Sequence, residues 1–241
     1  MWIPRLLTTF LFHSAVFDNN QDVTSTSLRG LSGGASEGNE QPQHINTSSN
    51  FVPRYTGPPE DELTDSQRQI RDAILKSRPR TGLSGPFGPW LAVPDIADPA
   101  QALGRACRYG TSLSFYESEL VILLTGAKAK SHAEFDIHVG EALKAGLSME
   151  LINAIPRDDD FSLAAVKERV VPLLQNERER AIAIFTAELL DNYGVSDETY
   201  EMAKDALDSK DSVLVEITSI TGYYTYVAMT LNVFRIPSKQ T

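Results

Sequence analysis

Cysteine is almost missing from this chain of 241 residues, because Cys107 is its only example. A single thiol excludes an internal disulfide, a Cys-x-x-Cys redox pair and a zinc site built from several thiolates. Any chemistry of this protein must therefore proceed without paired thiols.

Basic residues are also few, with 22 Lys and Arg against 32 Asp and Glu and a net charge of -10. No basic run interrupts this acidic background, and proteins that bind nucleic acid use such runs to neutralise phosphates. We therefore expect no nucleic-acid partner.

The chain has no apolar run long enough for a confident membrane span. The first run, Leu6 to Phe17, follows Arg5 and is too short to cross a bilayer. It is typical of a signal peptide over residues 1–17, which predicts a secreted protein; an uncleaved extension of a cytoplasmic protein is the alternative. The run from Val213 to Val233 has Glu216 as its only charge, but its threonines and tyrosines favour burial within the fold, so we predict no membrane span.

Residues 18–52 contain mostly Asn, Gln, Ser, Thr and Gly. Such a composition cannot bury enough apolar surface to offset the entropy of ordering, so it predicts a disordered linker. One domain is expected over residues 53–238.

Helical signals follow one another through that domain, and no segment shows sustained strand alternation, so the predicted fold class is all-α. Thr64 and Gln67 form a capping-box pattern, and Ser114 or Ser118 can cap the helix that contains Glu119. The expected helices cover residues 64–76, 99–109, 115–124 or 119–124 (depending on the cap), 131–145, 149–155, 164–193 (interrupted at Pro172 and closed by Gly194), 197–207 and 213–233. The Gly/Pro-rich stretch around residues 81–94 predicts an irregular loop.

The stretch from Glu119 to His138 carries the strongest chemical signal. Ser131, Glu134 and His138 are spaced i, i+3 and i+7, which places them on one helix face. His138 borders the apolar stripe of the same helix, so we expect a partly buried imidazole whose pKa responds to its surroundings. This face is a candidate proton-transfer site.

Several motifs occur in an order that resembles a known family. They are GPF at 85–87, ELVIL at 119–123, AEFDIH at 133–138, then EALKAGLSMELINAI and, near the end, ITGYYTYVAMTLNVFRIP. Together they resemble the carboxymuconolactone decarboxylase family of the AhpD-like helical superfamily, over about residues 53–237.

The resemblance implies an AhpD-like helical domain that assembles into trimers or hexamers, with a pocket between helices. It also implies decarboxylation of a small carboxylated lactone without metal or organic cofactor. In the hydroperoxidase branch of the superfamily a glutamate precedes a Cys-x-x-Cys pair and a histidine; the matching positions here are Glu119, Ser131, Glu134 and His138. The thiols are missing, so a dithiol peroxidase cycle is chemically unavailable.

The catalytic residues that this comparison implies are His138, Glu134 and Glu119. Loss of CO2 leaves an electron-rich dienolate, which His138 would protonate while one glutamate orients or recharges it. Ala133 stands where the decarboxylase branch typically has tyrosine, so a different lactone or a β-keto acid is the expected substrate.

Substrate contacts are predicted at two kinds of position. Arginines that flank the Gly/Pro-rich loop can pair with a substrate carboxylate, and Ser131 and Phe87 come from the matched motifs. The arginines are Arg54, Arg78 and Arg80.

Two further functions stay open at the level of sequence. One is a non-catalytic oligomeric or secreted binding protein, which the altered residue before Glu134 permits. The other is an alkylhydroperoxidase or peroxiredoxin-type antioxidant, which the missing Cys-x-x-Cys pair disfavours.

Overall fold

The computed structural model describes residues 52–78 and 82–238, which belong to one compact unit. This part of the chain is helical and contains no strand, which confirms the all-α prediction. The predicted signal peptide, Arg80 and nearly all of the predicted linker lie outside the described residues, so those predictions stay untested.

The first helix, α1 (Asp65–Ser77), begins as its sequence predicts. Thr64 Oγ1 accepts a hydrogen bond from the Gln67 backbone N–H, and Gln67 Oε1 accepts one from the Thr64 N–H. This reciprocal capping box satisfies two backbone donors that would otherwise lack partners at a helix start.

The Gly/Pro-rich stretch differs from its prediction, because it contains the short helix α2 (Phe87–Trp90) and the start of α3 (Pro94–Tyr109). Helix α3 was expected to begin at Pro99. Pro94 instead occupies the first turn, where its fixed φ suits a helix and its missing N–H costs nothing, and Pro99 is accommodated inside the helix.

Helix α4 (Phe115–Lys128) forms the centre of the domain. Ser114, the first of its two predicted caps, makes a capping box with Glu117, and all residues from Glu117 to Ala127 are buried. It packs against α5, α8 and α10. A helix that is apolar on all sides is expected to be enclosed in this way.

Replacing Ser114 with alanine should lower the free energy of unfolding by about 1 kcal/mol, because the Glu117 N–H loses its acceptor. Urea denaturation measures the change. Ser238→Ala, at an exposed position outside the helices, is the matched control and should leave stability unchanged. Equal stability of both variants would contradict the capping role.

The second half of the domain adds six helices. These are α5 (His132–Ala145), α6 (Met149–Ala154), α7 (Leu163–Arg169), α8 (Glu177–Asn192), α9 (Asp197–Ala206) and α10 (Asp211–Phe234), with 3-10 turns at Asp158–Asp160 and Val171–Leu173; a further 3-10 turn, Glu60–Glu62, precedes α1. Gly146 ends α5 in the left-handed conformation, which glycine adopts readily. Helix α8 ends differently from its prediction: Tyr193, not Gly194, adopts the left-handed φ of 57°, its N–H donates to Leu189 O, and its side chain is largely exposed.

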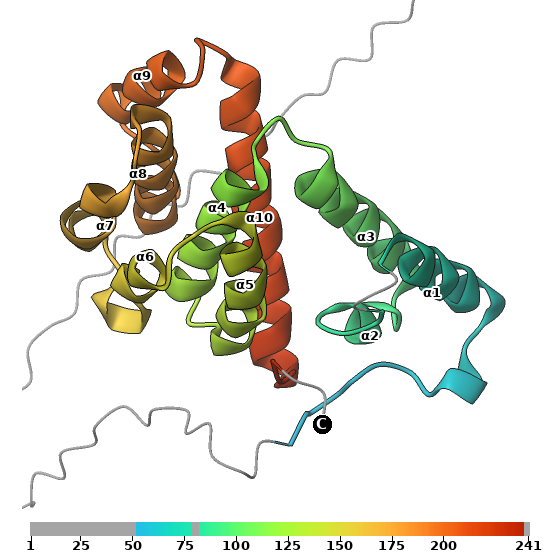
Figure 1. Ribbon diagram of the computed structural model, residues 1–241. Helices are drawn as coiled ribbons and strands as arrows, with labels where there is room; N and C mark the ends of the chain where they lie inside the picture. The colour runs from blue at the N-terminus through green and yellow to red at the C-terminus, as the bar shows by residue number, and fades with distance from the viewer. Residues whose placement is uncertain (1–51, 79–81, 239–241) are drawn as a thin grey trace, which may run out of the picture. The chain divides into compact units, whose positions relative to one another are not determined.

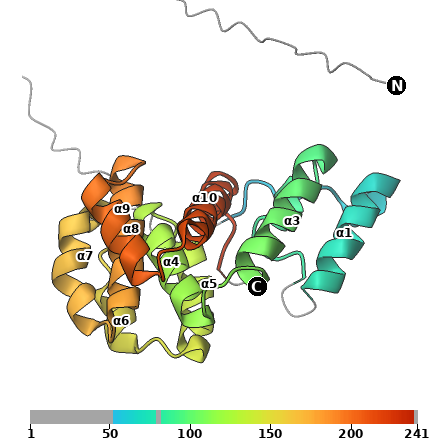
Figure 2. The same ribbon diagram turned by 90° about the horizontal axis from the view of Figure 1, so that it is seen from above.

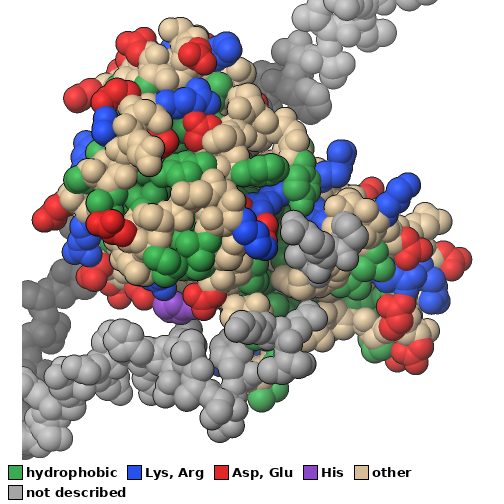
Figure 3. Space-filling model, in the orientation of Figure 1, with side chains coloured by type: hydrophobic (Ala, Val, Ile, Leu, Met, Phe, Trp, Pro, Cys, Tyr) green, Lys and Arg blue, Asp and Glu red, His purple; other side chains and the backbone are tan. Residues whose placement is uncertain are grey.

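Helix α10 lies between α3 on one side and α4, α5 and α8 on the other (Figures 1 and 2). Two apolar cores result, and α4 contributes to both, with Ile122 in the first and Leu123 in the second. On the face drawn in Figure 3, charged side chains are scattered around groups of hydrophobic ones, with other side chains and backbone between them. No helix in the described part is long and apolar enough to cross a membrane.

Candidate functional site

A cavity of about 570 Å³ lies among the end of α1, α2 and α3 on one side and α4, α5 and α10 on the other. Both polar and aromatic side chains line it. They include Arg78, Phe87, Arg108, Tyr109, Phe115, Glu119, Glu134, His138, Glu141, Lys144, Tyr223 and Tyr224.

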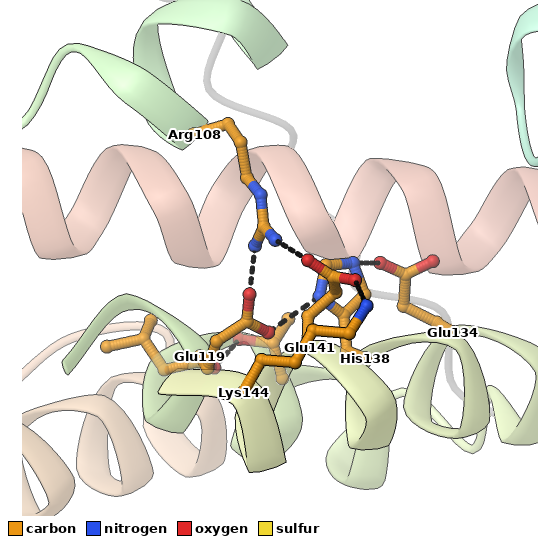
Figure 4. Close-up of polar contacts among 8 residues, drawn as sticks. Arg108, Glu119, Glu134, His138, Glu141 and Lys144 are labelled. Carbon is orange, nitrogen blue, oxygen red and sulfur yellow. Dashed lines mark hydrogen bonds and ion pairs between the residues drawn. The ribbon is translucent and has the colours of Figure 1, made fainter. Parts of the chain in front are cut away.

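His138 lies between two buried carboxylates on the wall of this cavity (Figure 4). Its Nδ1 is 2.8 Å from Glu119 Oε2, which comes from α4. Its Nε2 is 3.2 Å from Glu134 Oε1, one helical turn earlier on α5, at ion-pair distance but outside hydrogen-bond geometry. The Nδ1 hydrogen bond orients the ring, which leaves Nε2 as the nitrogen available for proton transfer.

The two carboxylates control the proton affinity of His138. Burial by itself lowers the pKa of the imidazole, but the negative charge of Glu134 and the contacts with both glutamates outweigh it, so the pKa is raised to about 9. The sequence predicted an imidazole whose pKa responds to its surroundings, and the structure shows the cause of the shift: two carboxylates face one ring.

Arg108 completes the polar network from a different helix. It reaches from α3 toward α4 and α5, where its Nη1 donates to Glu119 and its Nη2 lies 3.5 Å from Glu141 Oε2 (Figure 4). Lys144 Nζ donates to the other oxygen of Glu141 at 2.6 Å. Glu119 is only 1% exposed, and such a charge requires compensation, which Arg108 and His138 together supply.

Two tyrosines of α10 form the remaining wall. The ring of Tyr224 meets the His138 ring edge-on, with centroids 5.2 Å apart. The hydroxyl of Tyr223 lies over Gly104, where an added Cβ would be only 2.1 Å from it. Burial raises the pKa of both phenols, so each stays protonated at neutral pH.

The structure brings together five of the side chains predicted from sequence: Glu119, Glu134, His138, Phe87 and Arg78 all line the cavity. Ser131 does not share their face, because it is the N-cap of α5 with φ -100°, so the helical spacing does not extend to it. Its buried hydroxyl lies at a separate small recess beside Arg157.

The three predicted arginines also differ in whether they line the cavity. Arg54 hydrogen-bonds Val233 O at the end of α10 and does not line the cavity, whereas Arg78 does. Arg80 lies outside the described residues.

Sequence reasoning missed Arg108, Tyr223 and Tyr224. Arg108 precedes Glu119 by eleven residues on a separate helix, and the tyrosines are far along the chain, so no periodicity links them to His138. A buried glutamate inside an apolar helix was the one available signal, since such a charge needs a cation nearby.

In the described part of the chain, no group of three or more His, Cys, Asp or Glu side chains is arranged to hold a metal ion. The chain matches no protein-family model and no curated protein.

Proposed function

We propose that this protein is a cofactor-free lyase, resembling carboxymuconolactone decarboxylases of the AhpD-like superfamily, that removes CO2 from a small carboxylated lactone or keto acid. The observation that carries the proposal is the buried His138 held between Glu119 and Glu134 on the wall of a cavity large enough for such a molecule.

The proton transfer can be followed atom by atom. The C–C bond to the substrate carboxylate breaks, CO2 leaves, and the bonding electron pair stays on the substrate as an enolate. The enolate carbon takes the Nε2 proton of His138, and Glu134 beside that nitrogen relays a proton from solvent to restore it. Overall one proton is taken up for each CO2 released.

Glu119 and Arg108 act through His138. The Glu119 carboxylate keeps the proton on Nδ1 and stabilises the positive ring, while Arg108 holds Glu119 in place. We class both as positioning residues, because neither donates the proton to substrate.

The thiol-based alternative lacks a nucleophile. Cys107 is buried in the first apolar core, and burial raises the pKa of its thiol, which lowers the thiolate fraction. Turnover of hydroperoxides by this protein would contradict our mechanism.

The direct test is a substrate panel of 4-carboxymuconolactone, acetoacetate and further β-keto acids, with cumene hydroperoxide as the contrasting substrate. We expect CO2 release, measured by a coupled carbonate assay, from at least one of the acids and no peroxide consumption. A binding protein without catalysis would retain its ligand while releasing no CO2, and that result would reject the lyase.

The pH dependence of catalysis provides a second test. Because the acid form of His138 is the active one, kcat should stay constant up to about pH 9 and fall tenfold per unit above it. Glu134→Gln removes the negative charge that raises the pKa of His138, so the fall should begin at lower pH. Glu150→Gln, at an exposed position of α6, should leave the profile unchanged, and an unmoved profile in Glu134→Gln would contradict the assignment.

We also propose that the protein self-associates through the outer face of α10. Four exposed apolar side chains, Val215, Tyr226, Met229 and Val233, recur there with spacings typical of paired helices, and an added Cβ at Gly222 between them would meet nothing. These four positions carry no charge, which suits a contact with a second copy of the same face.

Replacing Met229 with glutamate should dissociate the oligomer, because a charge in the paired face would be desolvated. Light scattering after size-exclusion chromatography gives the mass and so decides between trimer and hexamer. The control is Ile96→Glu, at an exposed apolar position of α3. A monomeric wild type would reject this assembly.

A further inference from the structure

The cavity around His138 is larger than a small lactone acid needs. Its volume of about 570 Å³ falls within the range of about 300–1,000 Å³ that holds drug-sized ligands. Beside the polar cluster its wall is aromatic, with Phe87, Tyr223 and Tyr224. Size and lining together indicate a ligand with a ring system.

Two exposed aromatic side chains extend this lining outward. Tyr109 at the end of α3 and Phe115 at the start of α4 both line the cavity, yet they are 58% and 59% exposed. Aromatic rings that are open to solvent at a cavity provide a stacking surface for another ring.

Arg78 supplies a cation on the cavity wall. In the described part of the chain no carboxylate pairs with it, whereas Arg108 is engaged by Glu119 and Glu141. Its guanidinium is fixed by hydrogen bonds to Ser77 Oγ and to Gln101 O and lies 4.5 Å from the centroid of the Phe87 ring.

A guanidinium has five N–H donors, and these hydrogen bonds use two of them. A fixed guanidinium with free donors on a cavity wall is suited to a carboxylate, because little side-chain entropy is lost on binding.

We propose that the site binds an aromatic carboxylic acid of about two fused rings, with its carboxylate on Arg78 and its rings against Phe87, Phe115 and Tyr109. The role of this ligand in turnover rests on the proposed function, whereas its binding does not depend on that function. For turnover it gives the substrate class as lactone or keto acids that carry an aromatic ring system, in place of small aliphatic ones.

Binding of unreactive probes tests the proposal independently of catalysis. Isothermal titration calorimetry with 2-naphthoate, 2-naphthamide and acetate should show 2-naphthoate binding to the wild type at least tenfold more tightly than either of the others. Arg78→Gln should weaken 2-naphthoate at least tenfold while leaving 2-naphthamide unchanged, and Arg78→Lys should fall between. Phe115→Ala should weaken 2-naphthoate and leave acetate unaffected.

Arg68→Gln, an exposed arginine on α1, is the matched control and should bind all probes as the wild type does. Thermal unfolding of each variant confirms that it folds. Acetate binding as tightly as 2-naphthoate, or Arg78→Gln binding 2-naphthoate normally, would overturn the proposal. Naphthoate binding together with no CO2 release from any acid of the substrate panel would reject only the lyase function, and turnover of small acids without naphthoate binding would reject only this inference.

Discussion

Replacing His138 with glutamine is expected to lower kcat by about 10²–10⁴, the contribution typical of a positioned general acid. Glutamine retains a hydrogen-bond donor for Glu119 but has no proton that it can transfer. The measurement is the rate of CO2 release under saturating substrate. The control is His132→Gln, since His132 lies on the same helix with its side chain 45% exposed and its Nε2 3.6 Å from Asp158.

The same variant should change how stability depends on pH. In the folded protein His138 keeps its proton up to about pH 9, whereas in the unfolded chain it loses it near its ordinary value of 6.5. The stabilisation is therefore fully present below pH 6.5 and is lost as pH rises through 9, and its size is ~3 kcal/mol.

Urea denaturation at several pH values should show this loss in the wild type and not in His138→Gln. Because the single variant leaves two buried carboxylates facing a neutral side chain, the double variant Glu119→Gln/His138→Gln provides a second comparison with one negative charge fewer. An unchanged kcat in both would remove His138 from the mechanism.

Replacing Arg108 with methionine is expected to lower the free energy of unfolding by about 3–5 kcal/mol, the usual cost of breaking a buried ion pair by removing one partner. Methionine retains much of the apolar stem of arginine, so the loss comes mainly from the charge and its hydrogen bonds. Glu119, which is 1% exposed, would then have His138 as its only cationic partner among the described residues.

Arg105→Met provides the matched comparison, because Arg105 is exposed on the same helix and its loss should change stability by no more than about 0.5 kcal/mol. Adding Glu119→Gln to Arg108→Met should recover part of the loss, and a double-mutant cycle measures the coupling. Equal effects of the two arginine variants would show that Arg108 does not hold Glu119.

The sequence by itself determined most of the helices. Capping residues such as Thr64, Ser114 and Ser148 act on the backbone beside them, and Gly146 supplies a local conformation that other residues avoid, so these signals act over a few residues. The errors came where local rules allow more than one outcome, as at Pro94 and Pro99, both of which α3 accommodates.

The pairing of Glu134 with His138 was also readable, because one turn of helix fixes it. The partnership of Glu119 with His138 joins α4 to α5, and Arg108 arrives from α3, so both depend on how the helices pack. Local spacing contains no information about such contacts. The sequence thus determined the all-α class, the single thiol and the acid-base residues. Only the tertiary structure decided that α3, α4 and α5 place Arg108, Glu119 and Glu134 around the His138 ring. It also decided that Ser131 and Arg54 lie elsewhere and that Arg78 lies on the cavity wall.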